Sequence, residues 1–415
     1  MTALLLKRVR LEESFEYTNE QIIATNTGIY DVLITNGVIT AIAPQIEAVN
    51  DMEMYDAQCQ LLLPAFREMH IHLDKTYFGG DWQAPSIATN GIQTRIDEEK
   101  ILLPKQLPTA ALRAEKIVQM LISQGHTYIR SHCNVDQQIG TKHVELVKEV
   151  LERYRGQITY DIVAFPQHGL LKSNVLPLMK EAMQLGATLV GGVDPATVDR
   201  DIDGSLQQMV DIAVQYNAGV DLHLHDGDTL GAFEIKKLAA LTKDAGKQGH
   251  VTVSHAFALA GLEKSSLDEL IAQMSEVQMD VTSTVPTGLK ANTIPIPYLW
   301  ENGVCVSVGH DSLVDHWSPF GTGNTITKLN ILAERFRYID EYTISRTWKY
   351  ASGGITPLND AGERVWPQVG DAANMLLLDG VSTAHVVARR CPITTVISSG
   401  TIIHQSSIEL KGAYR

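Results

Sequence analysis

The sequence predicts an α/β fold: a parallel (β/α)8 barrel of the TIM type, with a small β-sandwich domain built from both ends of the chain. Two observations carry this prediction. From about residue 61 onward, eight strand-like runs alternate with helical segments, whereas the two ends of the chain contain strand-like runs instead. Alternating strands and helices are typical of a parallel sheet covered by helices. The chain of 415 residues is long enough for a barrel of about 250 residues and a second domain.

Short strands are predicted at both ends of the chain. YDVLITNGVITAIAP alternates apolar and polar residues and contains the turn signal Asn36-Gly37. ANMLLLDG and TTVISSGTII, within the last fifty residues, have the same character. We therefore expect residues 1–60 and 365–415 to pair as the small β domain, and residues 61–364 to form the barrel.

The middle of the chain contains the eight barrel strands. In order, these runs are LLLPAFREMHIHL, TYIRSHCNV, ITYDIVAFPQ, ATLVGGVDP, GVDLHLHD, HVTVSHAFAL, QMDVTSTVPT and VCVSVGHDS. Between most of them lie amphipathic segments such as KHVELVKEVLERY, whose apolar residues recur three and four positions apart. An open doubly wound sheet is the alternative on this pattern alone, but no glycine-rich phosphate fingerprint follows the first strand.

One long connection stands out after the first barrel strand. Residues 76–104 are rich in glycine and polar residues, and a loop of this length in a compact domain is usually functional or disordered. It reads equally well as a lid over a site or as a plain surface loop. Lys75, just before it, is expected to brace the loop or a neighbouring carboxylate.

Composition and charge limit the class of partner. The chain has 34 Lys and Arg against 48 Asp and Glu, a net charge of −14, which disfavours nucleic acid or an anionic membrane and suits a neutral or cationic small molecule. No apolar run approaches the roughly 18 residues of a membrane span, and the first residues do not resemble a secretion signal. The four cysteines are far apart and form no Cys-x-x-Cys motif, so we expect reduced thiols in a cytoplasmic protein.

Polar side chains gather where the predicted barrel strands end, which is where barrel enzymes carry their chemistry. In strand order these residues are His70 and His72, His132, Gln167, Asp194, His223 with His225 and Asp226, His255, and His310 with Asp311. Helical His-Glu-x-x-His, phosphate-loop and Gly-x-Ser-x-Gly motifs are absent from the sequence. HVE at residues 143–145 matches half of a nucleotide-type zinc deaminase signature, but no cysteine pair follows it.

His70 and His72 predict a metal site. Residues two apart on a strand point to one face, here the barrel interior. Two imidazoles in one cavity suit a divalent transition metal, and His223, His255 and Asp311 are the obvious further ligands. A buried His-x-His pair without a partner is unfavourable, so the metal interpretation outweighs a structural one.

The isolated polar residues favour structural interpretations. A lone histidine at a strand end is more often a hydrogen-bonded core residue than a ligand, and we expect this of His132 and His310. Asp194 fits a turn with a helix cap. His225 alternates with His223, so it is expected to face away from the cavity.

Five stretches, in this order, resemble bacterial cytosine deaminase and its relatives in the amidohydrolase superfamily: HIHLDKT, IVAFPQHG, VDLHLHD, VTVSHA and VSVGHDSLVDHWSPFGTGN. The resemblance runs nearly end to end. It implies one catalytic zinc or iron ion held by His70, His72, His223 and Asp311. It also implies that His255 hydrogen-bonds the attacking water, that Gln167 contacts a substrate carbonyl or ring edge, and that Trp317 walls the pocket. The resembling enzymes form symmetric oligomers, so a homo-oligomer is expected.

Two residues depart from the cytosine deaminase pattern. Asp226 stands where that family has a proton-shuttling glutamate, and a displacement of roughly 1 Å at such a group can lower a rate on the order of 100-fold. Ser312 stands where that family has an acid that touches the pyrimidine, and a serine is not an anionic acceptor. Cytosine itself is therefore not the expected substrate.

The resulting hypothesis is metal-dependent hydrolysis of a C–N bond, by deamination of a small nitrogen heterocycle. Asp311 takes a proton from the attacking water, His255 steadies the oxygen of the tetrahedral intermediate, and Asp226 passes a proton to the leaving nitrogen. Gln167, Ser312 and Trp317 bind the substrate. The alternatives are release of an alkylamine or opening of a cyclic amide on the same site and, from another class, a metal-binding barrel that has lost catalysis.

Overall fold

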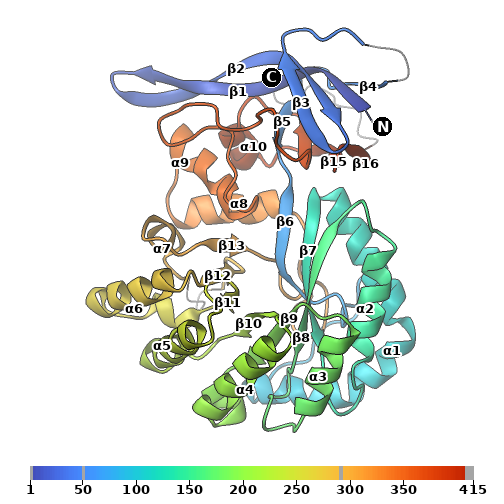
Figure 1. Ribbon diagram of the computed structural model, residues 1–415, viewed down its shortest axis with the longest axis vertical. Helices are drawn as coiled ribbons and strands as arrows, with labels where there is room; N and C mark the ends of the chain where they lie inside the picture. Colours follow the sequence, from blue (N-terminus) through green and yellow to red (C-terminus); the bar gives the residue numbers. More distant parts are fainter. Residues whose placement is uncertain (1–2, 49–51, 289–292, 407–415) are drawn as a thin grey trace.

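The computed structural model describes residues 3–48, 52–288 and 293–406, and it contains two large sheets (Figure 1). The barrel sheet is parallel, and each strand pairs with the next one along the chain. Its strands are β6 Phe66–Ile71, β7 His126–Asn134, β8 Thr159–Phe165, β9 Leu189–Val193, β10 Gly219–His223, β11 Val251–Ser254, β12 Asp280–Ser283 and β13 Val306–Val308. All eight predicted barrel strands are confirmed.

The barrel closes between its first and last strands. Ile71 and Asp311 form an isolated parallel bridge, and the backbone N–H of Asp311 donates to the carbonyl of His70 at 2.7 Å. This closure brings the ends of β6 and β13 together at the mouth of the barrel, where His70, His72 and Asp311 lie.

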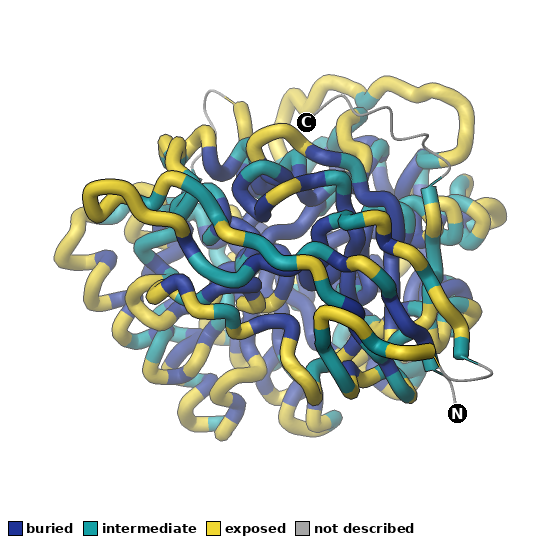
Figure 2. The backbone as a smooth tube through the Cα atoms, turned by 90° about the horizontal axis from the view of Figure 1, so that it is seen from above, coloured by how far each residue is buried: buried dark blue, intermediate teal, exposed yellow. Residues whose placement is uncertain are grey.

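Helices surround the barrel strands, which are buried on both faces as a parallel sheet requires. The helices are α1 Gly91–Ser123, α2 Lys142–Glu152, α3 Leu176–Leu185, α4 Ile202–Gln215, α5 Asp228–Asp244, α6 Lys264–Glu276, α7 Ile296–Glu301, α8 Thr325–Arg335, α9 Glu341–Ser345 and α10 Thr383–Arg389, with short turns η1 Pro195–Asp199, η2 Phe257–Ala260 and η3 Arg346–Tyr350. Seen from above, buried segments lie at the centre and exposed turns at the periphery (Figure 2). No helix in the described ranges is long and apolar enough to cross a membrane.

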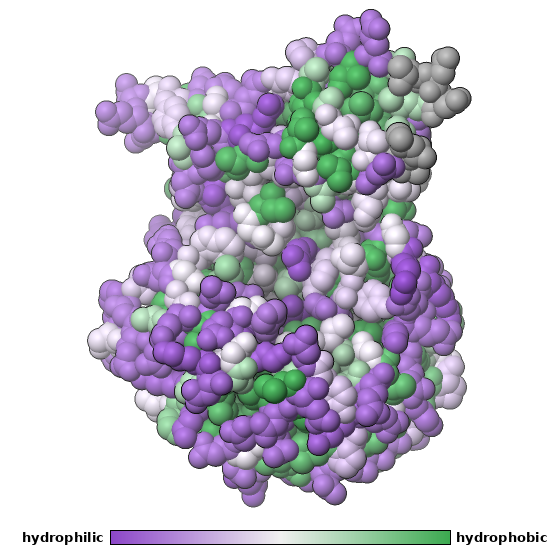
Figure 3. All heavy atoms as spheres, viewed as in Figure 1, coloured by the Kyte–Doolittle hydropathy of each residue, from purple (hydrophilic) through white to green (hydrophobic). Residues whose placement is uncertain are grey.

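Both ends of the chain build the second sheet, as predicted (Figure 1). Its strands are β1 Ala3–Thr18, β2 Gln21–Thr35, β3 Val38–Ala43, β4 Glu53–Asp56, β5 Leu61–Pro64, β14 Met375–Leu378, β15 Ile393–Ser398 and β16 Thr401–Gln405. β5, which the sequence analysis read as part of the first barrel strand, pairs with β14 in this sheet. The division into residues 1–60 with 365–415 and residues 61–364 otherwise stays a prediction. On the face drawn in Figure 3, hydrophilic residues cover most of the barrel, and hydrophobic residues are grouped over this end sheet.

The expectation of a loop over residues 76–104 is wrong in its second half. α1 begins at Gly91 and continues to Ser123 through Pro104 and Pro108. The glycine and polar content of this stretch favoured a loop, yet it forms a helix in which Pro104 and Pro108 each remove a backbone donor. The difference matters for the site, because it places the buried Glu99 on a helix over the barrel mouth.

Candidate active site

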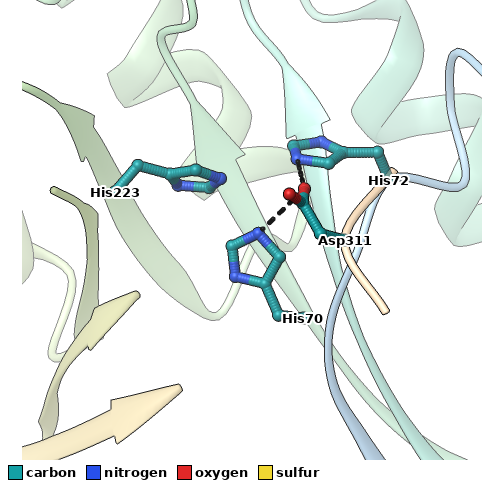
Figure 4. A group of neighbouring side chains, drawn as sticks. All are labelled: His70, His72, His223 and Asp311. Atoms are coloured by element: carbon teal, nitrogen blue, oxygen red, sulfur yellow. Dashed lines mark ion pairs between the residues drawn. The ribbon is translucent and has the colours of Figure 1, made fainter. Parts of the chain in front are cut away.

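Four side chains converge at the mouth of the barrel (Figure 4). His70 lies on β6, His72 just beyond it, His223 at the end of β10, and Asp311 after β13. Each offers one ligand atom, and these four atoms lie within 4.8 Å of one another. Asp311 Oδ1 is 3.2 Å from His72 Nε2 and 3.4 Å from His70 Nε2. The structure therefore brings together the four residues that the resemblance implied as ligands.

The chemistry of this cluster fits a divalent cation. In the described part of the chain, His70 Nε2 and both ring nitrogens of His223 are buried without a hydrogen-bond partner. Unpartnered buried nitrogens are unfavourable, and a metal ion would satisfy them. Burial also lowers the pKa of His72 and His223, which keeps their imidazoles neutral, as metal ligands must be. Three neutral imidazoles and one carboxylate suit zinc or iron.

The carboxylate of the cluster is ionised. Burial alone would raise the pKa of Asp311, but the adjacent imidazoles of His70, His72 and His255 hold that pKa well below its usual range. Asp311 also lies beside His255, whose Nε2 is 4.0 Å from Asp311 Oδ2 and has no partner among the described residues. The pair is therefore placed to act on one small molecule between them.

A hydrogen-bond relay fixes the orientation of His70. Ser254 Oγ lies 2.8 Å from His70 Nδ1 and donates to Asp221 Oδ1 at 2.7 Å, so it accepts the Nδ1 proton of His70. Arg130 forms an ion pair with Asp221, in which a guanidinium nitrogen lies 3.0 Å from Asp221 Oδ2. With its proton on Nδ1, His70 presents a bare Nε2 lone pair to the cluster, as expected for a metal-ligating histidine.

Two other groups of histidine and acid residues lie nearby, and the acids of both are already engaged. In one group Glu68 accepts from His310 Nδ1, while His126 Nε2 is 2.9 Å from Thr325 Oγ1. The other combines His70 and His132 with Asp221, which is engaged in the relay. Both ring nitrogens of His132 are buried without a described partner, so the expectation of a hydrogen-bonded core histidine is wrong for this residue. The structural interpretation of His310 is thus supported by its bond to Glu68.

A cavity of about 230 Å3 opens beside the four-residue cluster. Besides His72, His223 and Asp311 of the cluster, its walls include His255, Gln167, Ser312 and Trp317, all predicted site residues. Most of the residues that meet here were therefore predicted from the sequence. Lys75, His225 and Ser318 also line the cavity and were not predicted to do so.

Lys75 sets the orientation of Gln167. Its ammonium donates to Gln167 Oε1 at 2.9 Å, to Glu99 Oε1 at 3.1 Å and to Asn134 Oδ1 at 3.4 Å. These three bonds use all three ammonium protons. Because its Oε1 is engaged, Gln167 is left with its amide N–H groups to offer a substrate. Lys75 braces a carboxylate, as expected, and positions a substrate-facing amide as well.

Glu99 is the residue that sequence reasoning missed entirely. It is fully buried on α1 and accepts hydrogen bonds from Lys75, Asn134, His168, His316 and Trp317. Burial opposes its ionisation, but the charge of Lys75 and the histidine bonds hold the pKa of Glu99 well below its usual range. Its carboxylate joins α1 to the last residue of β7 and to residues after β6, β8 and β13, so it connects one wall of the cavity.

His225 and Asp226 lie differently from the expectation. The strand alternation stops at His223, where β10 ends, so His225 turns to line the cavity instead of facing away. Its Nδ1 bonds Asp194 Oδ2 at 2.8 Å. Burial lowers the pKa of His225, but Asp194 more than offsets this and raises it. Asp226 instead accepts hydrogen bonds from Thr197 and is not among the residues lining the cavity.

A buried acid next to Asp226 predicts a pH-dependent stability. Glu234 is fully buried, and burial raises its pKa from 4.5 to about 8. The folded protein therefore holds this proton more tightly than the unfolded chain, so this carboxyl lowers the free energy of unfolding as the pH rises from about 4.5 to 8. Glu234→Gln should remove this loss. Measured by urea unfolding, the free energy of unfolding of the variant relative to wild type should increase by more than about 1 kcal/mol between pH 5 and pH 8, since one pKa unit corresponds to about 1.36 kcal/mol. A difference from wild type that is constant with pH would contradict the assignment.

Comparison with known proteins places this architecture in a family. Residues 145–404 match the model described as "Amidohydrolase family". The chain is 41% identical to the uncharacterized protein YahJ of Escherichia coli (strain K12), over 96% of this chain and 87% of that protein. It is 28% identical to N-isopropylammelide isopropyl amidohydrolase of Pseudomonas sp. (strain ADP), over 92% of this chain and 94% of that enzyme.

A solved structure agrees. N-isopropylammelide isopropylaminohydrolase from Burkholderia multivorans ATCC 17616 superposes with a TM-score of 0.85 at 29% identity, covering 98% of this chain and 99% of that one. Members of the superfamily use a divalent metal and act on small molecules, which agrees with the histidine and aspartate cluster described above. The chain therefore belongs to the amidohydrolase family and is a hydrolase acting on carbon–nitrogen bonds other than peptide bonds.

Proposed function

We propose that this protein deaminates a small nitrogen heterocycle, using one zinc or iron ion held by His70, His72, His223 and Asp311. The observation that carries the proposal is the convergence of these four ligand atoms within 4.8 Å, with buried ring nitrogens that have no other described partner. The deaminases among its relatives support the reaction class, since a pterin deaminase shares 24% identity over 55% of this chain.

The bound ion would supply a nucleophilic water near neutral pH, because such metals lower the pKa of water from about 15.7 towards 7. Asp311, held ionised, would accept a proton from the attacking water. His255, 4.0 Å from Asp311, donates a hydrogen bond to the oxygen that develops negative charge.

We assign proton transfer to the leaving nitrogen to His225 in place of Asp226. His225 lines the cavity, and Asp194 stabilises its charged form. Asp226 faces Thr197 instead, so it acts on the substrate only after a change of rotamer.

The substrate-binding wall consists of Gln167, Ser312 and Trp317. Gln167 offers an amide N–H, because Lys75 occupies its oxygen, so the substrate presents an acceptor such as a ring carbonyl at that point. Trp317 donates its indole N–H to Glu99 at 3.1 Å, which leaves its ring to pack against a planar substrate. Ser312 supplies a neutral hydroxyl, which agrees with a substrate other than cytosine.

A second candidate is release of an alkylamine from a ring substituent. It is favoured by the similarity in sequence and structure to two enzymes named for removing the isopropylamine of N-isopropylammelide. The same residues would serve, because the leaving nitrogen differs only in its alkyl group. A homo-oligomer and a cytoplasmic location stay predictions.

A substrate panel tests these proposals. Metal-replete protein is incubated with aminopyrimidines, aminotriazines, pterins, N-alkylated aminotriazines and cyclic ureides, while released ammonia and amines are measured. Ammonia from one ring class supports deamination, and an alkylamine or ring opening assigns the protein to the alternatives. No product from any compound, with metal bound, would favour a barrel that has lost catalysis.

A further inference from the structure

A second cavity adjoins the candidate active site. It measures about 220 Å3 and shares Ser312 and Ser318 with the cavity beside the four-residue cluster. Each cavity alone is smaller than the roughly 300 Å3 at which small-molecule sites begin, whereas the two together exceed it. Because serine stands at position 312, only a short side chain separates the two cavities. A substrate ring in the first cavity can therefore carry a substituent into the second.

The second cavity contains a cation with no described acidic partner. Lys328, in the first turn of α8, lines it, and its ammonium donates to the carbonyl of Thr284 at 2.8 Å. No carboxylate lies within 4.0 Å of this ammonium in residues 3–48, 52–288 and 293–406. Two ammonium protons thus remain for another acceptor. Glu68 and Asp311 act on this ammonium through space but do not bond it, so an anion in the cavity would be its first directly bonded counter-charge.

Two further features describe the occupant, one as polar and one as anionic. His310 also lines this cavity, is 9% exposed, and has no described partner for its Nε2, which accepts a hydrogen bond because Nδ1 donates to Glu68. The N-terminus of α8, capped by Asn324, lies at the cavity and favours negative charge there. Parallel barrels frequently bind anions at this place, between the loops after the seventh and eighth strands.

We propose that the physiological substrate is a nitrogen heterocycle bearing a short anionic arm, a carboxylate or a phosphate, which passes Ser312 and binds Lys328. The inference rests on the proposed function for the ring in the first cavity. The walls between the two ends include Leu313, Phe320 and Ile331, so the arm has an apolar linker between ring and anion. Ser312 then acts as the residue that admits the arm.

Direct binding tests this proposal without requiring turnover. Titration calorimetry on the metal-replete full chain compares uracil with uracil-5-acetate, uracil-6-acetate and 5-phosphonomethyluracil, none of which has an amine to release. At least one acid should bind about tenfold more tightly than uracil, the scale of one charge-assisted hydrogen bond. Whichever of the carboxylate and phosphonate compounds binds more tightly identifies the anion that the subsite prefers.

Variants locate the effect. Lys328→Met should abolish the preference for the acid, and Lys328→Arg should retain part of it. Ser312→Phe should weaken binding of the acid more than binding of uracil, because the larger side chain closes the opening between the two cavities. Arg335→Ala, which removes an exposed charge from the far end of the same helix, should leave the preference intact.

The outcomes separate the two proposals. An acid preference that survives Lys328→Met, or no acid binding more tightly than uracil, overturns the anionic arm. The protein could also bind an acid more tightly than uracil and yet release no ammonia or amine from any panel compound. That result would support the anion subsite and overturn the deaminase assignment.

Discussion

Asp311→Asn is expected to lower turnover at least 1000-fold, within the roughly 100- to 10,000-fold contribution of a positioned general base. The asparagine has nearly the same shape as aspartate, but its neutral amide neither accepts a proton from water nor offers an anionic ligand. Asp311 is the only acid in the four-residue cluster, and its ionised form is the one that His70 and His72 stabilise. Both the proton acceptor and the negative charge of the site are therefore lost together.

The measurement is steady-state turnover of the best panel substrate, together with metal content per chain by mass spectrometry. Metal occupancy should fall as well, and His70→Ala should lower it further. The control is Asp211→Asn, at an exposed position of α4, which should stay within about twofold of wild type. Retention of one tenth of the activity by Asp311→Asn would exclude Asp311 as the base.

Glu99→Gln is expected to lower the free energy of unfolding by about 3 kcal/mol, at the lower end of the 3–5 kcal/mol typical of breaking a buried ion pair. Lys75 would keep its positive charge in a fully buried position without the carboxylate that compensates it. The amide also offers one acceptor where the carboxylate serves five donors. The wall formed by Lys75, Gln167 and Trp317 should loosen, so KM should rise more than kcat falls.

Urea unfolding of wild type and variant measures the stability effect. Asp97→Asn is the matched control on the same helix, because Asp97 forms an exposed pair with Lys100 at 2.8 Å and should leave the free energy of unfolding close to that of wild type. The indole N–H resonance of Trp317, identified with Trp317→Phe, gives a readout that needs no substrate. An unchanged indole shift and a loss below 1 kcal/mol in Glu99→Gln would refute its role in positioning the wall.

The part of the site that follows strand geometry was predictable from sequence. His70 and His72 alternate on β6 and must share a face, and Asp311 follows a strand that ends at the same mouth. The eight strands were recognisable because each run is apolar and bounded by turn or helix signals. The pairing of the two chain ends followed from their strand-like runs, although the expectation of short strands is wrong for β1 and β2, which have 16 and 15 residues.

The residues that failed prediction depend on contacts distant in sequence or on where an element stops. Glu99 lies in a polar stretch followed by two prolines, so neither its helix nor its burial has a local signal. His225 was misjudged because two-residue alternation applies only inside a strand, and β10 ends at His223. Asp226 was assigned by analogy to a glutamate, and its rotamer toward Thr197 is not encoded in spacing.

The bridge between Ile71 and Asp311 has a consequence for biosynthesis. It joins the first barrel strand to the residues after the eighth, and the four converging side chains span both sides of this seam. During translation, His70, His72 and His223 leave the ribosome well before Asp311, so the seam stays open until the last strand has been made. Completion of the proposed metal site is therefore a late event in biosynthesis, and a chain truncated before residue 311 would carry its three imidazoles on a barrel that has not closed.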